Sequence, residues 1–371
     1  MKFFKFYGYN KKTKYPHQLV DMRKIDIITP NLKIKHSGVT STIVGLYPEH
    51  RRLGWRLVIF GYFLPKSIIS IGIFSLISCW QKPTGKNNRI WHARRNNEML
   101  VGVLMRDVLR MPLKLIFTSS SQRHHTRWTK YLISRMDAII TTSEKSSLYI
   151  KRPSTIIMHG IDTERFHPIS NKREARRQIK ILEDTKIIGC FGRIRKKKGT
   201  GLFVDCMINI LPTNPGWIAV IIGRTTFKNY FFKKNLQKRI YEAGLEKRIL
   251  LINEQPSIEK WYRALNIFVA PNLHEGFGLT PLEAMASGIP VVASDVGVFR
   301  ELLDPENEKA GVIFQTGNIN ELEKSVLYFM NSENIMSDTG NRGRERAVKN
   351  FHISKEASEI GKVYDHFLKK Q

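Results

Sequence analysis

Cysteine is scarce in this chain. The 371 residues contain only Cys79, Cys190 and Cys206. These three form no metal-binding or redox spacing, and their odd number argues for a reducing compartment rather than a disulfide framework. Paired aspartates at D-x-D spacing, which could hold a metal, are also missing from the sequence. We therefore expect a cytoplasmic protein that needs no metal cofactor.

Acidic residues are few compared with basic ones. The chain has 32 Asp and Glu against 61 Lys and Arg, which gives a formal net charge of +29. Such a charge requires an anionic partner: nucleic acid, anionic lipid or a phosphorylated substrate. Because helix-turn-helix, zinc-finger and RNP patterns are absent, nucleic acid is the less favoured partner. We expect a membrane surface, where headgroups attract basic residues at about 1 kcal/mol each.

Long apolar runs are also rare. Only Leu57–Trp80, LVIFGYFLPKSIISIGIFSLISCW, has about the length needed to cross a bilayer. Pro65 and Lys66 interrupt it near the middle, and glycine and serine dilute it. We predict two shorter buried elements, with membrane contact by the aromatic first half left open and a single membrane span as the alternative. No apolar core follows the basic N-terminus, so no secretory signal is predicted.

The stretch LHEGFGLTPLEAMASGIPVV, residues 273–292, is the most informative part of the chain. An apolar run before it, LNIFVAP, predicts a buried strand. Thr280 as N-cap and Pro281 in the first turn predict a helix that runs to Gly288. IPVVAS then predicts the next strand. The unit is therefore strand, glycine-rich loop, helix and strand, as in an open α/β domain.

Two carboxylates, Glu275 and Glu283, flank this glycine-rich loop. The loop directs free backbone N–H groups and the positive end of a helix at one point, which suits a phosphate. Two acids beside an anion site are better suited to accept hydrogen bonds from hydroxyl groups, as sugars offer. The pattern predicts a nucleotide-sugar site. The alternative is a first-turn helix acid beside a plain tight turn.

The stretch resembles the signature of retaining glycosyltransferase family 4, whose members carry two glutamates separated by seven residues around a GFGL-type loop. The resemblance implies a GT-B fold: two doubly wound α/β Rossmann-like domains facing a cleft. It implies that Glu275 orients sugar hydroxyls and that Glu283 binds the ribose. Further donor-binding residues expected around the loops are Gly38, Gly192, Gly276, Phe277, Gly278, Leu279 and Thr280.

A basic run follows another predicted strand, in TKIIGCFGRIRKKKGTG. The family places an arginine and a lysine here to hold the donor diphosphate, and Arg193 and Lys198 match that pattern. A guanidinium and an ammonium group would stabilise charge that grows on the leaving phosphate. Whether Lys196, Lys197 or Lys198 is the matching lysine stays open, and a solvated charge run is the alternative.

A dinucleotide-binding fingerprint is the competing interpretation of this same region. Gly199 and Gly201 begin a G-x-G, but Val204 stands where the last glycine is required. Arg224 lies near the position of the expected acidic residue. A nicotinamide cofactor is therefore excluded.

Polar loops also follow the three strands predicted in the first half of the chain. The first is KIDIITPNL, the second is a short strand from Arg89 that ends at Trp91 or His92, and the third begins at Leu113 and ends before Ser119. Ligands bind at the carboxyl ends of such strands, and clustered Arg and His there suit an anionic acceptor. A plain loop with solvated histidines is the alternative. Ser119 or Ser120 falls where several family members carry a histidine near the donor sugar. The expected acceptor-binding residues are His92, Arg94, Arg95, Arg123 and His124.

The segments WHARRNNEML, FTSSSQRHHTRWTKYLISRMDAIITTSE and IMHGIDTERFHP resemble the subgroup that builds bacterial lipopolysaccharide core, the alphaproteobacterial core mannosyltransferases. The resemblance implies transfer of mannose from GDP-mannose, with retained configuration, to a lipid-linked anionic saccharide at the cytoplasmic face of the inner membrane. It implies a peripheral membrane protein that needs no metal. The alternatives are a transferase of another cell-envelope glycan, an inactive transferase-like scaffold and a basic nucleic-acid-binding protein.

These patterns divide the chain into four parts. A basic extension is predicted at residues 1–22 and an acceptor-binding domain at 23–170. A nucleotide-sugar-binding domain is predicted at 171–345. Residues 346–371 are predicted to form a helix that returns to the first domain.

Overall fold

The computed structural model describes residues 20–33, 38–62, 64–304 and 309–368. The chain forms two compact units: unit 1 is Met1–Gly160 with Ile353–Gln371, and unit 2 is Ile161–His352. The sequence analysis placed these boundaries at 170/171 and 345/346. Most of the predicted basic extension lies outside the described residues. Each unit is a parallel sheet with helices on both faces, which confirms the predicted fold class.

Unit 1 contains a parallel sheet with the strand order β3-β2-β1-β4-β5-β6-β7. Its central strands are nearly continuous apolar runs, as expected for strands that are buried on both faces. The order reverses between β1 and β4, which pair in parallel. The strands are β1 (Ile27–Asn31), β2 (Leu57–Gly61), β3 (Ser70–Ile71), β4 (Arg89–Ala93), β5 (Leu113–Ser119), β6 (Ala138–Thr141) and β7 (Thr155–Ile156).

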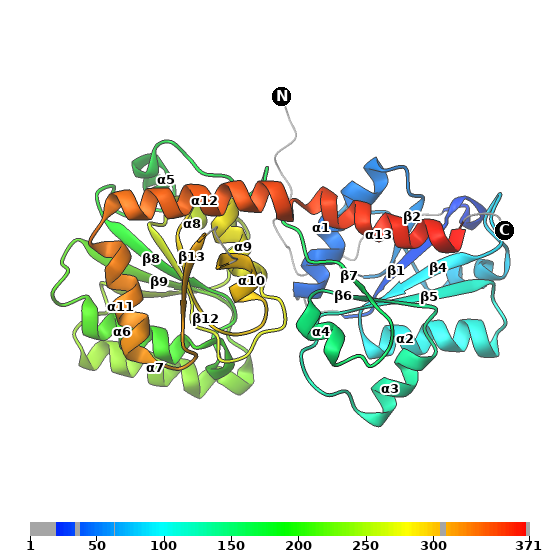
Figure 1. Cartoon of the computed structure of the whole chain (residues 1–371), viewed down its shortest axis with the longest axis horizontal. Coiled ribbons are helices and arrows are strands. Elements are labelled where there is room, and N and C mark those ends of the chain that lie inside the picture. The colour runs from blue at the N-terminus through cyan, green and yellow to red at the C-terminus, as the bar shows by residue number, and fades with distance from the viewer. Residues whose placement is uncertain (1–19, 34–37, 63, 305–308, 369–371) are drawn as a thin grey trace. The chain divides into compact units, whose positions relative to one another are not determined.

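Helices cover both faces of the unit 1 sheet (Figure 1). The helices α1 (Gly38–Arg52) and α13 (Ile353–Leu368) share one apolar core with the sheet. The helices α2 (Asn96–Val103) and α3 (Arg127–Ser134) share the other. The C-terminal segment thus packs within unit 1. The shorter helical elements are η1 (Met22–Lys24), η3 (Leu104–Val108, a π-helix) and α4 (Glu144–Leu148).

The apolar run Leu57–Trp80 does not form one long helix. It divides into β2, β3 and the 3₁₀ helix η2 (Ile73–Trp80). The division of the run is confirmed, although two buried elements were predicted and the structure has three. Burial is incomplete, because several apolar side chains of η2 are exposed. Within the described ranges, no helix is both long and apolar enough to cross a membrane.

Unit 2 contains a second parallel sheet with the order β10-β9-β8-β11-β12-β13. The helices α6, α7 and α11 contribute to the core on one face (Figure 1). The strands are β8 (Lys186–Phe191), β9 (Trp217–Ile222), β10 (Ile249–Ile252), β11 (Ile267–Ala270), β12 (Val291–Ser294) and β13 (Gly311–Phe314). The helices are α5 (Lys172–Gln178), η4 (Lys196–Lys198), α6 (Thr200–Ile210), η5 (Phe227–Asn229), α7 (Tyr230–Glu242), α8 (Ile258–Ala264), α9 (Leu279–Ala286), α10 (Phe299–Leu303), α11 (Ile319–Met330) and α12 (Glu333–Phe351).

All three cysteines are buried and unpaired. Burial raises the pKa of Cys79, and it raises the pKa of Cys190 to about 12. The pKa of Cys206 is raised for the same reason. The thiols therefore stay protonated near neutral pH and serve as small apolar core groups.

Candidate active site

The two motif loops of unit 2 leave neighbouring strands. The strand order reverses between β8 and β11, and in parallel α/β sheets ligands bind at the carboxyl ends of strands at such a point. The basic run follows β8 and the glycine-rich loop follows β11. Parallel pairing of these strands places both loops at the same edge of the sheet.

Backbone contacts join the two loops. The carbonyl of Lys197 accepts hydrogen bonds from the N–H groups of Leu273 at 3.1 Å and His274 at 3.3 Å. Gly199 has a φ of 67°, and a Cβ at this position would lie 1.6 Å from the carbonyl oxygen of Pro271. Only glycine permits this approach without a backbone shift. The basic loop is therefore fixed against the acidic loop.

Lys198 and Glu275 meet at the centre of this arrangement. The ammonium group of Lys198 contacts Oε2 of Glu275, and both side chains are largely buried. Asn272 donates to the same oxygen at 2.8 Å, and the Gly276 N–H donates to Oε1 at 3.1 Å. The carboxylate is thus held in one orientation beside a cation. Such a pair offers both a phosphate-binding ammonium and a hydroxyl-binding acid.

Arginines lie on either side of the buried Ile194. Arg193 is exposed, whereas Arg195 is half-buried, and its Nε has no hydrogen-bond partner in the described part of the chain. Burial lowers the pKa of Arg195, the charge of Arg193 lowers it further, and the charge of Glu275 raises it. The charges of Arg195 and Glu275 therefore influence each other, although no ion pair joins the two side chains in the described ranges. The sequence analysis missed Arg195, because it matched only the first and last basic residues of the run to the family pattern.

Glu283 lies in α9 and is held by a tyrosine of α8. The hydroxyl of Tyr262 donates to Oε2 of Glu283 at 2.7 Å and also lies 3.2 Å from the carbonyl of Thr280. Burial raises the pKa of Glu283, while the Tyr262 hydrogen bond and the charge of Lys198 oppose that shift. Lys198 thus acts electrostatically on Glu283 as well as pairing with Glu275. Tyr262 was missed because it lies in α8, outside every motif that was recognised in the sequence.

The helix α9 begins earlier than the sequence predicted. Its first residue is Leu279, and Gly278 with a φ of 81° precedes it as the cap. Thr280 is therefore not the N-cap, and the prediction was wrong at this point. Glycine suits this cap, because a Cβ on Gly278 would lie 2.8 Å from Cγ of Glu275 and 2.6 Å from the Phe299 ring. The buried Phe277 sits just before this turn.

Gly192 adopts a φ of 137°, a conformation that favours glycine. Its N–H donates to the carbonyl of Ile222 at 2.9 Å. Its carbonyl oxygen lies so close to Gly223 that a Cβ on Gly223 would be 1.6 Å from this oxygen. Gly192 therefore fixes the start of the basic loop against the end of β9.

His92 of unit 1 is enclosed, although the sequence analysis expected it at an open strand end. The strand β4 continues to Ala93, and the ring of His92 is 0% exposed. Its Nδ1 lies 2.6 Å from the hydroxyl of Tyr364, and its Nε2 lies 2.7 Å from Oγ1 of Thr118. Burial lowers its pKa well below the usual range. The ring joins β4 to α13 and β5, and from this position it cannot touch an acceptor.

Arg94 and Arg95 point to different surroundings. Nε and Nη1 of Arg94 are buried and have no hydrogen-bond partner among the described residues. Burial, with the charge of Arg94 nearby, lowers the pKa of His50 to about 3. Arg94 and His50 line a cavity of about 10 Å³, about the size of one water molecule. Arg95 instead pairs with Glu98 and donates to Asn31 at 3.1 Å.

Arg123 and His124 lie on the loop between β5 and α3, and both are exposed. The ring of His124 packs edge-on against Tyr149 with a centroid separation of 5.2 Å. Gly38 is the first residue of α1, and a Cβ there would meet nothing within 4 Å. The structure thus places these three residues at positions that a ligand can reach.

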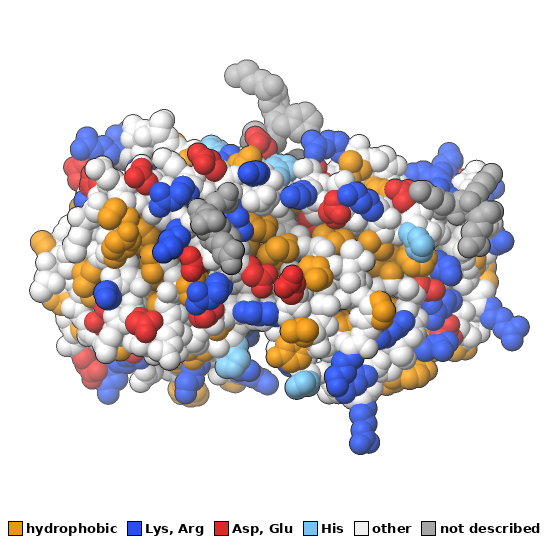
Figure 2. Space-filling view, viewed as in Figure 1, with side chains coloured by type: hydrophobic (Ala, Val, Ile, Leu, Met, Phe, Trp, Pro, Cys, Tyr) orange, Lys and Arg blue, Asp and Glu red, His pale blue; other side chains and the backbone are white. Residues whose placement is uncertain are grey.

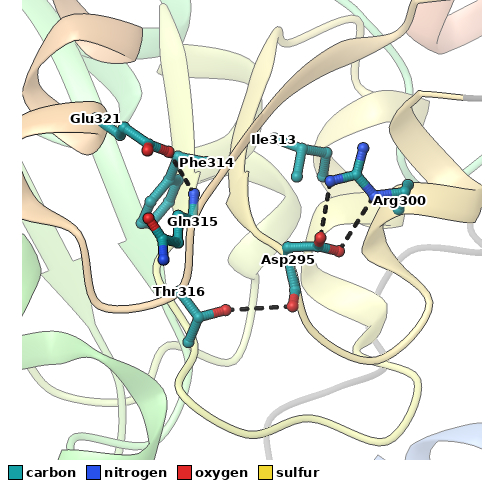
Figure 3. Close-up of a pocket in the computed structure, with 7 residues that line it drawn as sticks. All are labelled: Asp295, Arg300, Ile313, Phe314, Gln315, Thr316 and Glu321. Atoms are coloured by element: carbon teal, nitrogen blue, oxygen red, sulfur yellow. Dashed lines mark hydrogen bonds and ion pairs between the residues drawn. The ribbon is translucent and has the colours of Figure 1, made fainter.

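A cavity of about 460 Å³ lies at the carboxyl ends of β12 and β13 (Figure 3). Arg300 donates to Asp295 at 2.7 Å across it, and Glu321 accepts from the N–H of Gln315 at 2.6 Å. The charged side chains that line it are therefore paired with partners of their own. None of the predicted site residues lines this cavity.

No cluster of three or more His, Cys, Asp or Glu side chains that could hold a metal ion occurs in the described ranges. The cation that contacts Glu275 is the side chain of Lys198.

Comparison with known proteins gives the family. The model described as glycosyl transferases group 1 matches residues 171–346. The chain is 47% identical to the lipopolysaccharide core biosynthesis mannosyltransferase LpsB of Rhizobium meliloti (strain 1021), over 95% of this chain and 100% of that protein. It is 43% identical to the lipopolysaccharide core biosynthesis mannosyltransferase LpcC of Rhizobium leguminosarum bv. viciae, over 94% of this chain and 98% of that protein.

Solved structures agree in fold. Anabaena HepE in complex with UDP and glucose matches with a TM-score of 0.79 at 17% identity, over 92% of this chain and 100% of that one. Sucrose-phosphate synthase from Thermosynechococcus elongatus matches with a TM-score of 0.76 at 19% identity, over 92% of this chain and 98% of that one. The fold is GT-B. With two relatives above 40% identity over nearly their whole length, the chain belongs to the group 1 family of glycosyltransferases.

Proposed function

We propose that this glycosyltransferase moves mannose from GDP-mannose onto a lipid-linked saccharide of the lipopolysaccharide core, with retained anomeric configuration. The observation that carries the proposal is the Lys198–Glu275 pair at the switch point of the unit 2 sheet. The names of the two relatives above 40% identity supply the sugar and the acceptor class.

The donor diphosphate would be held by Lys198 and Arg193, together with the N-terminal end of α9. Lys198 now balances the charge of Glu275. When the donor binds, the ammonium group can contact a phosphate oxygen, and the carboxylate oxygens of Glu275 can accept hydrogen bonds from the sugar hydroxyls. Two cations near the leaving phosphate stabilise the negative charge that develops on it. No metal is needed in this scheme.

Glu283 would bind the ribose of the nucleotide. It lies one helical turn beyond the glycine-rich loop, and Tyr262 fixes its carboxylate. An ionised carboxylate accepts hydrogen bonds from both ribose hydroxyls, whereas the protonated form loses part of that capacity. Donor binding should therefore depend on the ionisation of Glu283.

The family resemblance implies a front-face reaction for the transfer itself. The bond between the anomeric carbon and the phosphate oxygen breaks, and the acceptor oxygen bonds to the same face of that carbon. The departing phosphate oxygen takes the proton of the acceptor hydroxyl. The products are the mannosylated acceptor and GDP, and no side-chain nucleophile is consumed.

The acceptor would be an anionic saccharide carried on a lipid at the cytoplasmic face of the inner membrane. Arg123 and His124 are exposed and could contact its acidic groups. Because His92 is enclosed and Arg95 is paired, we assign both to the support of this loop region rather than to direct contact. Basic side chains are spread over the face seen in Figure 2, which suits an anionic surface.

A donor panel tests the proposal. The melting temperature of the purified protein would be measured with GDP-mannose, GDP, UDP-glucose, UDP-galactose and ADP-glucose at equal concentration. We expect GDP and GDP-mannose to raise it, because ligands that bind only the folded state stabilise that state. Labelled GDP-mannose should then transfer its sugar to a lipid-linked core acceptor. Stabilisation by a UDP-sugar alone would overturn the assignment of the donor.

A further inference from the structure

The 3₁₀ helix η2 presents an apolar face that no described residue covers. Its sequence, IFSLISCW, contains no charged residue. Leu76 and Cys79 point into the core, whereas Phe74 is 84% exposed and Ile77 is 61% exposed. Ile73 and Trp80 are exposed beside them. Large exposed apolar groups gathered on one element indicate an interaction surface rather than isolated surface residues.

The adjoining π-helix η3 extends this face. The indole N–H of Trp80 donates to the carbonyl of Leu109 at 2.7 Å, which brings the end of η2 against the end of η3. Val108 and Leu109 are both exposed there. We call this surface the η2–η3 face. It consists of Ile73, Phe74, Ile77, Trp80, Val108 and Leu109.

Basic residues border the η2–η3 face. Lys82 lies two residues beyond Trp80, and Arg110 directly follows Leu109; both are exposed. The acid nearest in sequence, Asp107, is held by Arg106 and by Arg135 at 2.8 Å. The border of the face is therefore positive.

We propose that the η2–η3 face docks on the surface of an anionic bilayer. Phe74 and Ile77 enter the boundary between headgroups and acyl chains, and Lys82 and Arg110 contact lipid phosphates. Apolar side chains with a basic border are typical of elements that lie in the interface rather than cross it. Trp80 fits that boundary, because its ring is exposed while its N–H already has a partner.

Charge argues against a second copy of this chain as the occupant. A two-fold interface sets the same patch against itself. The exposed cations Lys82 and Arg110 would then face Lys82 and Arg110 of the other copy. A bilayer with anionic headgroups neutralises these charges instead. This inference rests on the proposed function in one respect, since a lipid-anchored acceptor gives the enzyme a reason to bind a membrane.

Sedimentation with vesicles tests the docking without donor or acceptor. The full chain would be mixed with vesicles of phosphatidylcholine alone and of phosphatidylcholine with phosphatidylglycerol. The test variant carries Phe74→Ser and Ile77→Ser. The matched control carries Phe227→Ser and Phe231→Ser, which remove two aromatic side chains that are 94% and 83% exposed in unit 2.

We expect the test variant to lose about a hundredfold in partition to the anionic vesicles, since each buried apolar side chain is worth about tenfold. The control should stay within about twofold of the wild type. A further variant, Lys82→Gln with Arg110→Gln, should bind anionic vesicles more weakly than the wild type. This difference in binding should become smaller as the salt concentration rises, and it should be absent with vesicles of phosphatidylcholine alone. Circular dichroism checks folding, and Phe74→Ser alone serves if the double variant does not fold.

Three results would overturn the proposal: unchanged vesicle binding by the test variant, an equal loss in the control, or a dimer in sedimentation velocity that only the test variant dissociates. The outcome is separate from that of the proposed function. Vesicle binding requires no sugar transfer, so an enzyme that uses another donor could still bind, and a mannosyltransferase could fail to bind.

Discussion

Replacing Tyr262 with phenylalanine should weaken nucleotide binding through Glu283. The ring packs edge-on against Phe191 with a centroid separation of 4.8 Å, and a phenylalanine keeps that packing. What is lost is the 2.7 Å hydrogen bond to Oε2 of Glu283. A hydrogen bond to a charged group contributes about 1.5–3 kcal/mol. If that energy orients the carboxylate toward the ribose, affinity for GDP should fall roughly tenfold to a hundredfold.

The pH dependence of binding provides the sharper measurement. Burial already raises the pKa of Glu283, and the Tyr262 hydrogen bond opposes the rise. Without that bond the pKa of Glu283 should rise further. GDP affinity, which requires the ionised carboxylate, should then begin to fall at a higher pH in Tyr262→Phe than in the wild type. Isothermal titration calorimetry across the acidic range would measure both midpoints.

The stability of Tyr262→Phe should depend on pH in the opposite sense to its GDP affinity. A carboxyl whose pKa is raised on folding stabilises the fold below its unfolded pKa, and that contribution is lost as pH rises through the folded pKa. Tyr262→Phe should therefore be relatively more stable in acid than at neutral pH. Tyr241→Phe is the matched control, because Tyr241 is exposed in α7 of the same unit. Equal GDP affinity and equal midpoints in wild type and Tyr262→Phe would refute the reasoning.

Three further changes address the paired loops. Glu275→Ala should reduce the rate of sugar transfer at least about a hundredfold, which is the loss seen when a preorganised polar group is removed from an active site. The circular dichroism spectrum should stay that of the wild type. Wild-type turnover in this variant would show that Glu275 has no role in the mechanism. Arg193→Ala should weaken GDP and GDP-mannose binding by the same factor in calorimetry, and unchanged GDP affinity would show that Arg193 does not hold the diphosphate. Gly199→Ala should lower the melting temperature and transfer together, because its Cβ would lie 1.6 Å from the Pro271 carbonyl oxygen; a wild-type melting curve would show that the loops can separate freely.

Strands and their order along the chain could be predicted from the sequence because apolar runs buried on both faces leave a plain signal. LNIFVAP and IPVVAS became β11 and β12, and Leu57–Trp80 divided as its proline and lysine indicated. The helix start at Leu279 was harder, since Thr280 is a good cap by residue type alone. The cap is instead Gly278, where a Cβ would meet Glu275 and Phe299, and the crowding by Phe299 is a tertiary contact.

The candidate site was predictable where each partner lies in a recognisable motif. Glu275 and Lys198 come from two loops, yet each lies in a recognisable pattern, and the structure brings them together. Tyr262 lies in no motif of its own, although it is hydrogen-bonded to Glu283. Arg195 lies within the basic run, but the family pattern was matched there only to Arg193 and Lys198. The prediction for His92 was wrong for a related reason, because Tyr364 of the returning helix α13 and Thr118 of β5, both distant in sequence, enclose its ring.

The three buried thiols have a practical consequence. Thiolate is the reactive form of cysteine, and burial keeps Cys79, Cys190 and Cys206 protonated. Maleimide reagents should therefore leave the native chain almost unlabelled. A single Phe74→Cys exchange would then take up a fluorophore at one defined place, and its emission would report the polarity around that side chain in water and on vesicles.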